Sequence, residues 1–459
     1  MTGGNTHFMK GNAISKLTIF LLIVICAWYG KNLDTWGKNK IIQNDVISYY
    51  AYLPATVIFG DLTFSFIPEL PEDFEGTIWL QTAPNGKPIL RMTMGLALLW
   101  LPFFLLAHLV AQLTGVSALG YSWPYSLSIF MAALFYVGAG LYYLRKIILK
   151  YVPDIVVAIT LATVVLATNM MYYVISEPGM SHVYSFALIV IFIYYTLKWI
   201  EIPGLKNTLV LGFLAGIIVL IRPVNILVLL FPALTGINTF RQFIQRMSGN
   251  WKMILLAGIA AFIILLPQMI YWKAQTGYFI FNSYLDSGKF YFLDPDILNG
   301  LISYRKGWLI YTPVMIFALG GIFLLRKNAI PLFLPIILFV LLNIYVVYSW
   351  WCWWYGGSFG SRPMIDMYGI MAIPLAFLLY RIWRKAHWIK GVAVIVLAGL
   401  LLLNQFQMKQ YRTSLLHWDS MTKEAYWGIF GRTTWPQGYE QMIKVPDYEK
   451  ALKGEEEYP

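Results

Sequence analysis

The chain has 459 residues, of which 59% are hydrophobic and only 12% are charged, and its formal net charge is +12 at pH 7. A soluble domain carries about 25% charged residues, so this composition excludes an ordinary soluble protein and indicates a polytopic membrane protein. In that class the excess of Lys and Arg belongs to the cytoplasmic loops, which explains the positive charge without nucleic acid as a partner. Cys26 and Cys352, the two cysteines, lie within or beside apolar segments and indicate neither a disulfide framework nor a metal cluster.

Candidate membrane spans follow one another along most of the chain, since a spanning helix needs about 20 mostly apolar residues. The apolar run of the first, Leu17 to Tyr29, follows Lys10 and Lys16 and resembles a signal-anchor helix. Two short segments join at Arg222-Pro223 and form either two tilted spans or one hairpin. In chain order the candidates are residues 14–30, 93–114, 123–144, 155–175, 183–200, 207–221, 223–237, 253–272, 308–325, 329–350, 364–380 and 389–407.

Loop charge selects a topology for these segments. With a cytoplasmic N-terminus and a segment 93–114 that does not cross, the cytoplasmic loops receive most clusters of Lys and Arg and only two acids, Asp154 and Glu201. A crossing at 93–114 would turn every later basic loop outward. We therefore expect this segment, with Pro102 in its middle, to be re-entrant or to lie on the membrane surface. A rival topology lets it span and places the N-terminus outside, and charge does not exclude it.

The expected fold class is all-α, a polytopic transmembrane bundle of about 11 spans. Its transmembrane domain covers residues 1–407 and includes a large first external loop, 31–122, with membrane-surface helices. Residues 408–459 form an external C-terminal tail, which either folds back on the membrane face or extends into solvent.

Asp45 is the first candidate for chemistry, a single carboxylate beside Tyr49, Tyr50 and Tyr52 at the start of the first external loop. An apolar wall makes a carboxylate a stronger base, as needed to take a proton from a hydroxyl. The alternative is a surface aspartate that caps a helix beside an interfacial belt of tyrosines. The sequence leaves both open.

The stretch "SEPGMSHVYSF", residues 176–186, places Glu177 and His182 around a Pro-Gly turn between two spans. These side chains either position an acceptor and tune Asp45, or serve only as turn and cap residues.

"SYRKGWLIYTP", residues 303–313, places the adjacent cations Arg305 and Lys306, after Tyr304, where a span begins on the outside. This position runs against the positive-inside rule and favours an anionic ligand, because Arg offers a planar fork that matches phosphate. The alternative is snorkelling to lipid headgroups.

"WWCWWYGGSFGSRPMID", residues 350–366, combines aromatic residues such as Tyr355 with three glycines and Arg362. Glycines beside an arginine allow a ligand to approach the backbone closely, although aromatic residues here also suit an interface belt. Arg222, inside an otherwise apolar stretch, is expected to face a cavity or a counter-ion. The sequence contains no P-loop, nucleophile elbow or dinucleotide-binding fingerprint.

These features together resemble the GT-C superfamily of membrane glycosyltransferases, in particular the branch with protein O-mannosyltransferases and the lipid A aminoarabinose transferase. The resemblance covers roughly residues 14–407 and rests on an opening helix, an acid early in the first external loop, a Pro-containing membrane-lying helix and the stretches "EPGMSHVYSF", "LISYRKGWLIYTP" and "WWYGGSFGSRP". Many relatives show Asp-Glu in the first loop, where this chain has Asn44-Asp45, so another residue such as Glu177 must align the acceptor.

The resemblance implies a hexosyl- or pentosyltransferase of the cell inner (plasma) membrane that moves a sugar from a polyprenyl-phosphate carrier to an external acceptor with inversion. Asp45 is the implied base on the periplasmic or external face. Membrane lipid and an acceptor that is protein, lipid or glycan are the expected partners, and a divalent metal is possible but not indicated. The alternatives are a transporter or flippase and a polymerase or ligase of lipid-linked glycans. The expected substrate-binding residues are Glu177, His182, Arg222, Tyr304, Arg305, Lys306, Tyr355 and Arg362.

Overall fold

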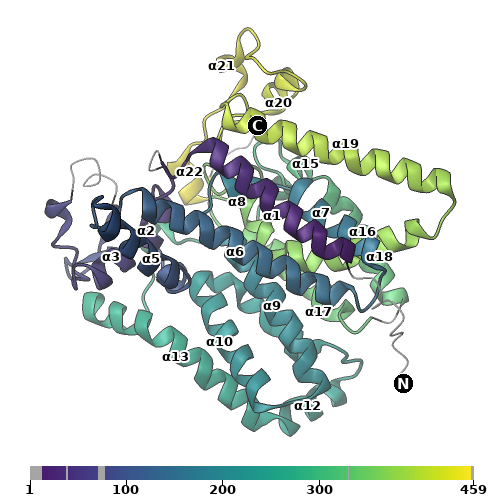
Figure 1. The fold of residues 1–459 in the computed structure, drawn as a ribbon, viewed down its shortest axis with the longest axis horizontal. Coiled ribbons are helices and arrows are strands. Elements are labelled where there is room, and N and C mark those ends of the chain that lie inside the picture. Colours follow the sequence, from purple (N-terminus) through teal and green to yellow (C-terminus); the bar gives the residue numbers. More distant parts are fainter. Residues whose placement is uncertain (1–12, 38–39, 71–77, 329, 456–459) are drawn as a thin grey trace.

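The structure, a computed structural model, describes residues 13–37, 40–70, 78–328 and 330–455 (Figure 1). Regular structure in these ranges is helical apart from an antiparallel hairpin of β1 (Leu80–Thr82) and β2 (Pro88–Leu90). Seven helical segments are long and apolar enough to cross a membrane. They are α1 (Ala13–Leu33), α5 (Gly95–Thr114), α6 (Trp123–Ile148), α9 (Ser181–Glu201), α13 (Trp251–Thr276), η5 (Arg362–Met367) continued by α18 (Tyr368–Trp383), and α19 (His387–Arg412).

Shorter helices complete the bundle, and the expected all-α polytopic fold is confirmed. Those between the first long helix and α13 are α2 (Asp45–Tyr50), α3 (Tyr52–Val57), η2 (Ile67–Glu69), α7 (Asp154–Leu166), α8 (Met170–Ile175), α10 (Leu205–Ile221), η3 (Pro223–Leu229), α11 (Leu230–Leu234) and α12 (Phe240–Gly249). Those after α13 are η4 (Leu285–Ser287), α14 (Ile297–Ile302), α15 (Trp308–Tyr311), α16 (Val314–Lys327), α17 (Phe333–Tyr348), α20 (Lys423–Ile429), α21 (Tyr439–Met442) and α22 (Tyr448–Lys453).

Three segments that hydropathy predicts as continuous helices are interrupted. Segment 155–175 divides into α7 and α8, and the side chain of Asn169 at the break donates to the Phe359 carbonyl oxygen at 2.9 Å. Segment 308–325 divides into α15 and α16 just before Pro313, which lacks a backbone N–H and disfavours a helical residue before it. Segment 223–237 is a 3₁₀ helix, η3, followed by α11. At each break, backbone N–H and C=O groups at the helix ends lose their partners within the helix.

Helix α5 lies along α6 rather than apart from the bundle. The Tyr125 hydroxyl is 2.7 Å from His108 Nδ1 near the end of α5, and Tyr136 donates to the carbonyl oxygen of Leu99 near its beginning at 3.5 Å. The two helices are therefore antiparallel, and α5 follows the first half of α6. That residues 93–114 do not cross the membrane stays a prediction.

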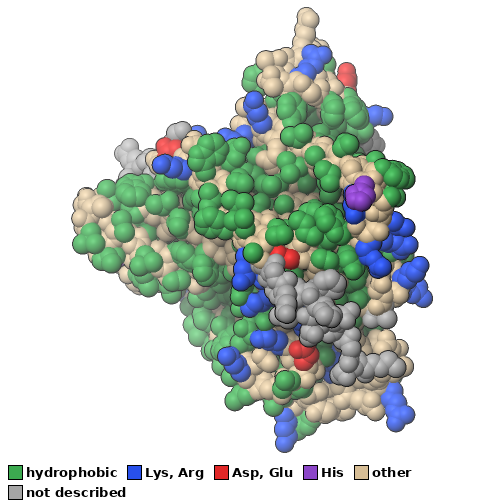
Figure 2. All heavy atoms as spheres, turned by 45° about the vertical axis from the view of Figure 1, so that its right-hand side comes forward, with side chains coloured by type: hydrophobic (Ala, Val, Ile, Leu, Met, Phe, Trp, Pro, Cys, Tyr) green, Lys and Arg blue, Asp and Glu red, His purple; other side chains and the backbone are tan. Residues whose placement is uncertain are grey.

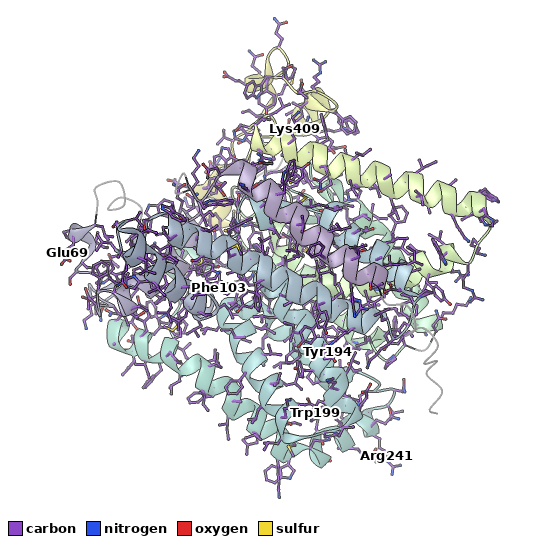
Figure 3. All side chains as sticks on the ribbon, viewed as in Figure 1. Glu69, Phe103, Tyr194, Trp199, Arg241 and Lys409 are labelled. Atoms are coloured by element: carbon purple, nitrogen blue, oxygen red, sulfur yellow. The ribbon has the colours of Figure 1, made fainter. Side chains whose placement is uncertain are left out.

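Apolar side chains cover broad areas of the face in Figure 2, and Lys and Arg appear at its top, along its right-hand edge and in its lower part. Figure 3 places Glu69 and Lys409 toward one end of the long helices and Arg241 toward the other. A membrane protein with lipid around its middle shows this separation of apolar belt and polar ends.

The described part of the tail packs on the loops 277–296 and 349–361. Tyr291 donates to the Leu452 carbonyl oxygen at 2.8 Å, and the backbone N–H of Ser358 donates to the Trp418 carbonyl oxygen at 3.3 Å. The rings of Trp354 and Tyr448 are 5.6 Å apart. Residues up to 455 are thus a cap on these loops, and not an extension into solvent.

Candidate active site

Asp45 and Arg362 form an ion pair although 317 positions separate them. Asp45 is the first residue of α2, and Arg362 is the first residue of η5. Arg362 Nη2 donates to Asp45 Oδ2 at 3.0 Å, and the two side chains are 15% and 30% exposed, respectively. The pair is therefore open enough to meet a ligand, while the protein screens it from most solvent.

Glu177 lies in the turn between α8 and α9, next to this pair. Its Oε1 accepts a hydrogen bond from the Tyr172 hydroxyl at 2.8 Å. Burial raises the pKa of Glu177 above its usual value, and the charge of Asp45 adds to this effect, while Arg362, Tyr172 and Lys306 oppose it. The charges of Asp45 and Arg362 therefore act on Glu177.

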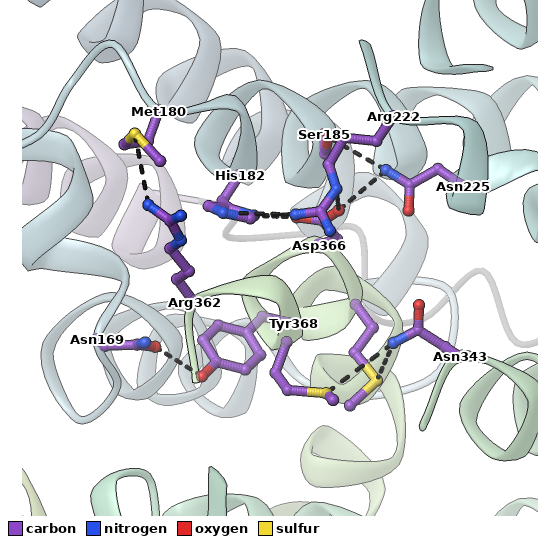
Figure 4. A network of polar contacts seen from close by, with 12 residues as sticks. Asn169, Met180, His182, Ser185, Arg222, Asn225, Asn343, Arg362, Asp366 and Tyr368 are labelled. Atoms are coloured by element: carbon purple, nitrogen blue, oxygen red, sulfur yellow. Dashed lines mark hydrogen bonds and ion pairs between the residues drawn. The ribbon is translucent and has the colours of Figure 1, made fainter. Parts of the chain in front are cut away.

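A second set of polar side chains surrounds Asp366, four residues after Arg362 (Figure 4). His182 Nδ1 is 2.9 Å from Asp366 Oδ1, and Arg222 Nε is 3.4 Å from Oδ2. Asn225 Nδ2 donates to the same Oδ2 at 3.0 Å and lies 3.2 Å from the Ser185 hydroxyl. Arg222 thus has the counter-ion that its apolar surroundings predicted.

Asp366 and Asn225 are residues that the sequence reasoning missed. Asp366 lies in the same stretch as the predicted site residue Arg362, and Asn225 lies three positions after the predicted site residue Arg222. A carboxylate at the start of the apolar segment 364–380 was the available signal, because a buried acid in a membrane protein needs a partner.

Tyr49 connects the two sets. Burial raises the pKa of its hydroxyl, the charge of Asp45 adds to the rise, and Arg222 and Arg362 oppose it. The charges of Asp45, Arg222 and Arg362 therefore all act on this one buried hydroxyl. We call Asp45, Glu177, Arg222, Lys306 and Arg362 the polar cluster.

Lys306 is the most deeply buried cation of the polar cluster. Its Nζ donates to the Ser358 carbonyl oxygen and lies 5.2 Å from the centre of the Tyr411 ring. Burial lowers the pKa of Lys306 to about 7, and the nearby positive charge of Arg362 contributes to the fall. The negative charges of Asp419 and Glu177 counteract it. Lys306 is therefore poised between its charged and neutral forms near neutral pH.

Arg305 and the two tyrosines occupy different positions around the cluster. The Arg305 guanidinium lies 5.2 Å above the Trp354 ring, buried behind Lys306. Tyr355 donates to the Val347 carbonyl oxygen at 3.0 Å, and Arg222 and Arg362 act on its hydroxyl. Tyr304 faces the tail, because its hydroxyl accepts a hydrogen bond from Trp427 Nε1 at 3.2 Å.

Across the described ranges, no group of three or more His, Cys, Asp or Glu side chains is arranged to hold a metal ion. The charge at the polar cluster comes instead from arginine and lysine. Such cations stabilise a phosphate that leaves with negative charge.

Neither the protein-family models nor the curated proteins that were searched contain a match to the chain. Solved structures do match. The chain is similar to the archaeal oligosaccharyltransferase AglB from Archaeoglobus fulgidus, in complex with an inhibitory peptide and a dolichol-phosphate, with 11% identity, a TM-score of 0.51, and coverage of 97% of this chain and 62% of that one.

Two further structures match with lower TM-scores. The oligosaccharyltransferase of Archaeoglobus fulgidus in the apo form has 12% identity and a TM-score of 0.47, over 96% of this chain and 61% of that chain. ArnT from Cupriavidus metallidurans in the apo state has 14% identity and a TM-score of 0.46, over 83% and 64%.

The chain spans less than two thirds of the length of each of these three proteins. At 11% identity the likeness with a TM-score of 0.51 shows the fold alone. The chain therefore has the GT-C type of fold that its sequence resembles.

Proposed function

We propose that this protein is a membrane glycosyltransferase that moves a sugar from a polyprenyl-phosphate donor to a hydroxyl of an external acceptor, with inversion. The observation that carries the proposal is the contact of Asp45 with Arg362 at 3.0 Å in a GT-C type of fold, close to Tyr49, on which the charge of Arg222 also acts. The AglB structure contains a dolichol-phosphate, and a lipid phosphate of this chemical class suits the cations of the polar cluster.

The cations of the cluster hold the donor phosphate. Arg362 and Arg222 are partly exposed and provide forked N–H donors, while Lys306 contributes charge from behind. As the sugar departs, its bond to the phosphate oxygen breaks and both electrons remain on that oxygen. Fixed cations stabilise this charge without a metal, because they are already oriented before the reaction.

Asp45 acts as the general base. The acceptor oxygen attacks the anomeric carbon from the side opposite the phosphate, which inverts the configuration, and its proton passes to the Asp45 carboxylate. Glu177, which retains a proton more readily than a surface glutamate, hydrogen-bonds the acceptor and takes the aligning role that a second first-loop acid has in relatives.

The ion pair between Asp45 and Arg362 gives the reaction an order. Before the donor binds, the guanidinium of Arg362 is engaged by the carboxylate that serves as base. The donor phosphodiester also carries a negative charge and accepts forked N–H donors, so it competes with the carboxylate for Arg362 and frees Asp45 for the acceptor hydroxyl. Donor binding therefore precedes activation of the acceptor.

Substitution of Asp45 by Asn tests the proposal. Membranes that contain Asp45→Asn should transfer sugar at a rate at least about 100-fold below the wild-type rate, because general-base catalysis contributes 10²–10⁴-fold. Asp61→Asn is the matched control, since Asp61 is in the same predicted external loop and its carboxylate accepts hydrogen bonds from Thr63 and Ser65.

Mass spectrometry of envelope glycans and glycoproteins from cells with and without the protein identifies the product of the transfer. Full transfer by a folded Asp45→Asn variant contradicts the role of Asp45. Translocation of a lipid-linked glycan in liposomes without a new glycosidic bond would favour a flippase instead.

A further inference from the structure

Asp366 collects three donors from two separate parts of the fold. His182 lies on α9, Arg222 lies at the junction of α10 and η3, and Asn225 lies on η3. All three place a nitrogen 2.9 to 3.4 Å from the carboxylate. The Asp366 side chain is 2% exposed, and removal of a charge from water to such a place is costly unless hydrogen bonds surround it.

The geometry divides the Arg222 guanidinium into two ends. Nε is directed to Asp366, whereas Nη1 lies 2.7 Å from His182 Nδ1. The Arg222 side chain keeps 14% of its surface exposed. Asp366 therefore holds the Nε side of the guanidinium, while Nη1 lies against His182 (Figure 4).

His182 Nδ1 cannot serve both of its neighbours. It lies 2.9 Å from Asp366 Oδ1, which requires a donor, and 2.7 Å from Arg222 Nη1, which requires an acceptor. A ring nitrogen carries either a proton or a lone pair. When its N–H is directed to Asp366, Nε2 of the same ring carries the lone pair and lies 3.4 Å from Nη1 of Arg222, so His182 and Asp366 hold the guanidinium together.

We propose that Asp366 is a positioning residue that fixes the Arg222 guanidinium for the phosphate group of the lipid donor. The inference rests on the proposed function, because it assigns the phosphate to that same site. Asn225 supports the arrangement through its bond to Asp366, so it belongs to the same positioning set.

Charge alone predicts the opposite outcome, which makes the proposal testable. If Asp366 only neutralised Arg222, Asp366→Asn would leave an uncompensated cation and bind an anion more tightly. If Asp366 positions Arg222, Asp366→Asn binds the phosphate less tightly, because the guanidinium loses its orientation.

The experiment measures binding of farnesyl phosphate to the purified full chain in nanodiscs, with farnesol as the uncharged probe. We expect Asp366→Asn to bind farnesyl phosphate about tenfold more weakly than the wild type, since hydrogen bonds to charged groups have that magnitude. Asn225→Ala should cause a smaller loss in the same direction. Binding of farnesol should not change in either variant.

Asn343→Ala is the matched control for Asn225→Ala. Asn343 is a buried asparagine of α17 whose amide lies 3.6 Å from the sulfur of Met367 and outside the Asp366 set (Figure 4). Thermal unfolding of each variant identifies any general loss of structure. A double variant with Arg222→Gln should show no further loss from Asp366→Asn, because the positioned group is then absent.

The two proposals fail differently. A wild-type chain that binds farnesyl phosphate no better than farnesol contradicts the proposed function. A wild-type chain that prefers the phosphate, with folded Asp366→Asn binding it equally or more tightly, contradicts the positioning role. If Asp366→Asn does not fold, Asn225→Ala decides: unchanged phosphate binding by it overturns the inference, and a loss confined to farnesyl phosphate supports it.

Discussion

Lys306 shows how the surroundings of one residue change its chemistry. A lysine in water keeps its proton to high pH, but the buried amine of Lys306 has its pKa lowered from 10.5 to about 7. The carbonyl oxygen of Ser358 and the ring of Tyr411 replace its hydration. A phosphate nearby would hold the proton on Lys306, so donor binding and protonation of this amine favour each other.

The lowered pKa of Lys306 predicts a pH dependence of stability. Between pH 7 and about 10.5 the unfolded chain binds a proton at this residue that the folded chain has lost, so the free energy of unfolding rises with pH there. The gain is at most about 1.4 kcal/mol per pH unit. Lys306→Met should remove it, and melting temperatures measured at pH 7 and pH 9 should differ less than in the wild type.

Lys289→Met is the control for that measurement, because Lys289 is an exposed lysine in the loop between α13 and α14. It should retain the wild-type difference between the two pH values. Equal differences in Lys306→Met and wild type would contradict the prediction.

Among the helices, α10 and α13 meet through small residues. A Cβ atom at Gly212 would lie 2.4 Å from the carbonyl oxygen of Ala257, and one at Gly216 would lie 2.7 Å from that of Ala261. Glycines four positions apart let two backbones approach, as is common for helices in membranes. Most of the α13 surface is outside the core, so this contact is a large part of what holds it.

Gly216→Ile should displace α13 from α10. Overpacking of this kind costs about 1–3 kcal/mol, and the melting temperature in detergent should fall. Gly258→Ile is the control on α13 itself, because a Cβ at Gly258 meets nothing within 4 Å. An unchanged melting temperature for Gly216→Ile would show that the helices can separate without loss.

The expectation that α5 does not cross the membrane is also tested at this scale. Lys87 precedes α5 and Ser117 follows it, and both are exposed. In a background without Cys26 and Cys352, cysteines at both positions should react with an impermeant maleimide from outside the cell. Lys150→Cys should react only after permeabilisation, and opposite sidedness of positions 87 and 117 would show that α5 spans.

At the scale of the whole molecule, the tail joins parts of the site that the chain introduces far apart. Asp419 accepts a hydrogen bond from Tyr448 at 2.9 Å and acts on Lys306 through its charge. Tyr304 and Trp354 contact tail residues as well. The tail thereby holds the loops that carry Arg305, Lys306 and the tryptophan-rich stretch in place.

Removal of residues 415–459 should expose Cys352, which is 6% exposed in the intact protein and lies near Tyr448. In a Cys26→Ser background, an external thiol reagent should label Cys352 in the shortened chain much faster than in the full chain. Tyr448→Ala should give an intermediate rate. Labelling at the same rate in all three would contradict the role of the tail as a cap.

Hydropathy and loop charge, which act locally along the chain, were enough to predict the class of protein, the all-α fold and most helix positions. They also indicated Asp45, Glu177, Arg222, Lys306 and Arg362 as polar groups with no local reason to lie near a membrane. Which of these groups meet follows from the tertiary structure: Arg362 pairs with Asp45, Arg222 with the overlooked Asp366, and Tyr304 with the tail. Pairing across hundreds of residues depends on how whole helices pack and where they break, and no single stretch of sequence contains that information.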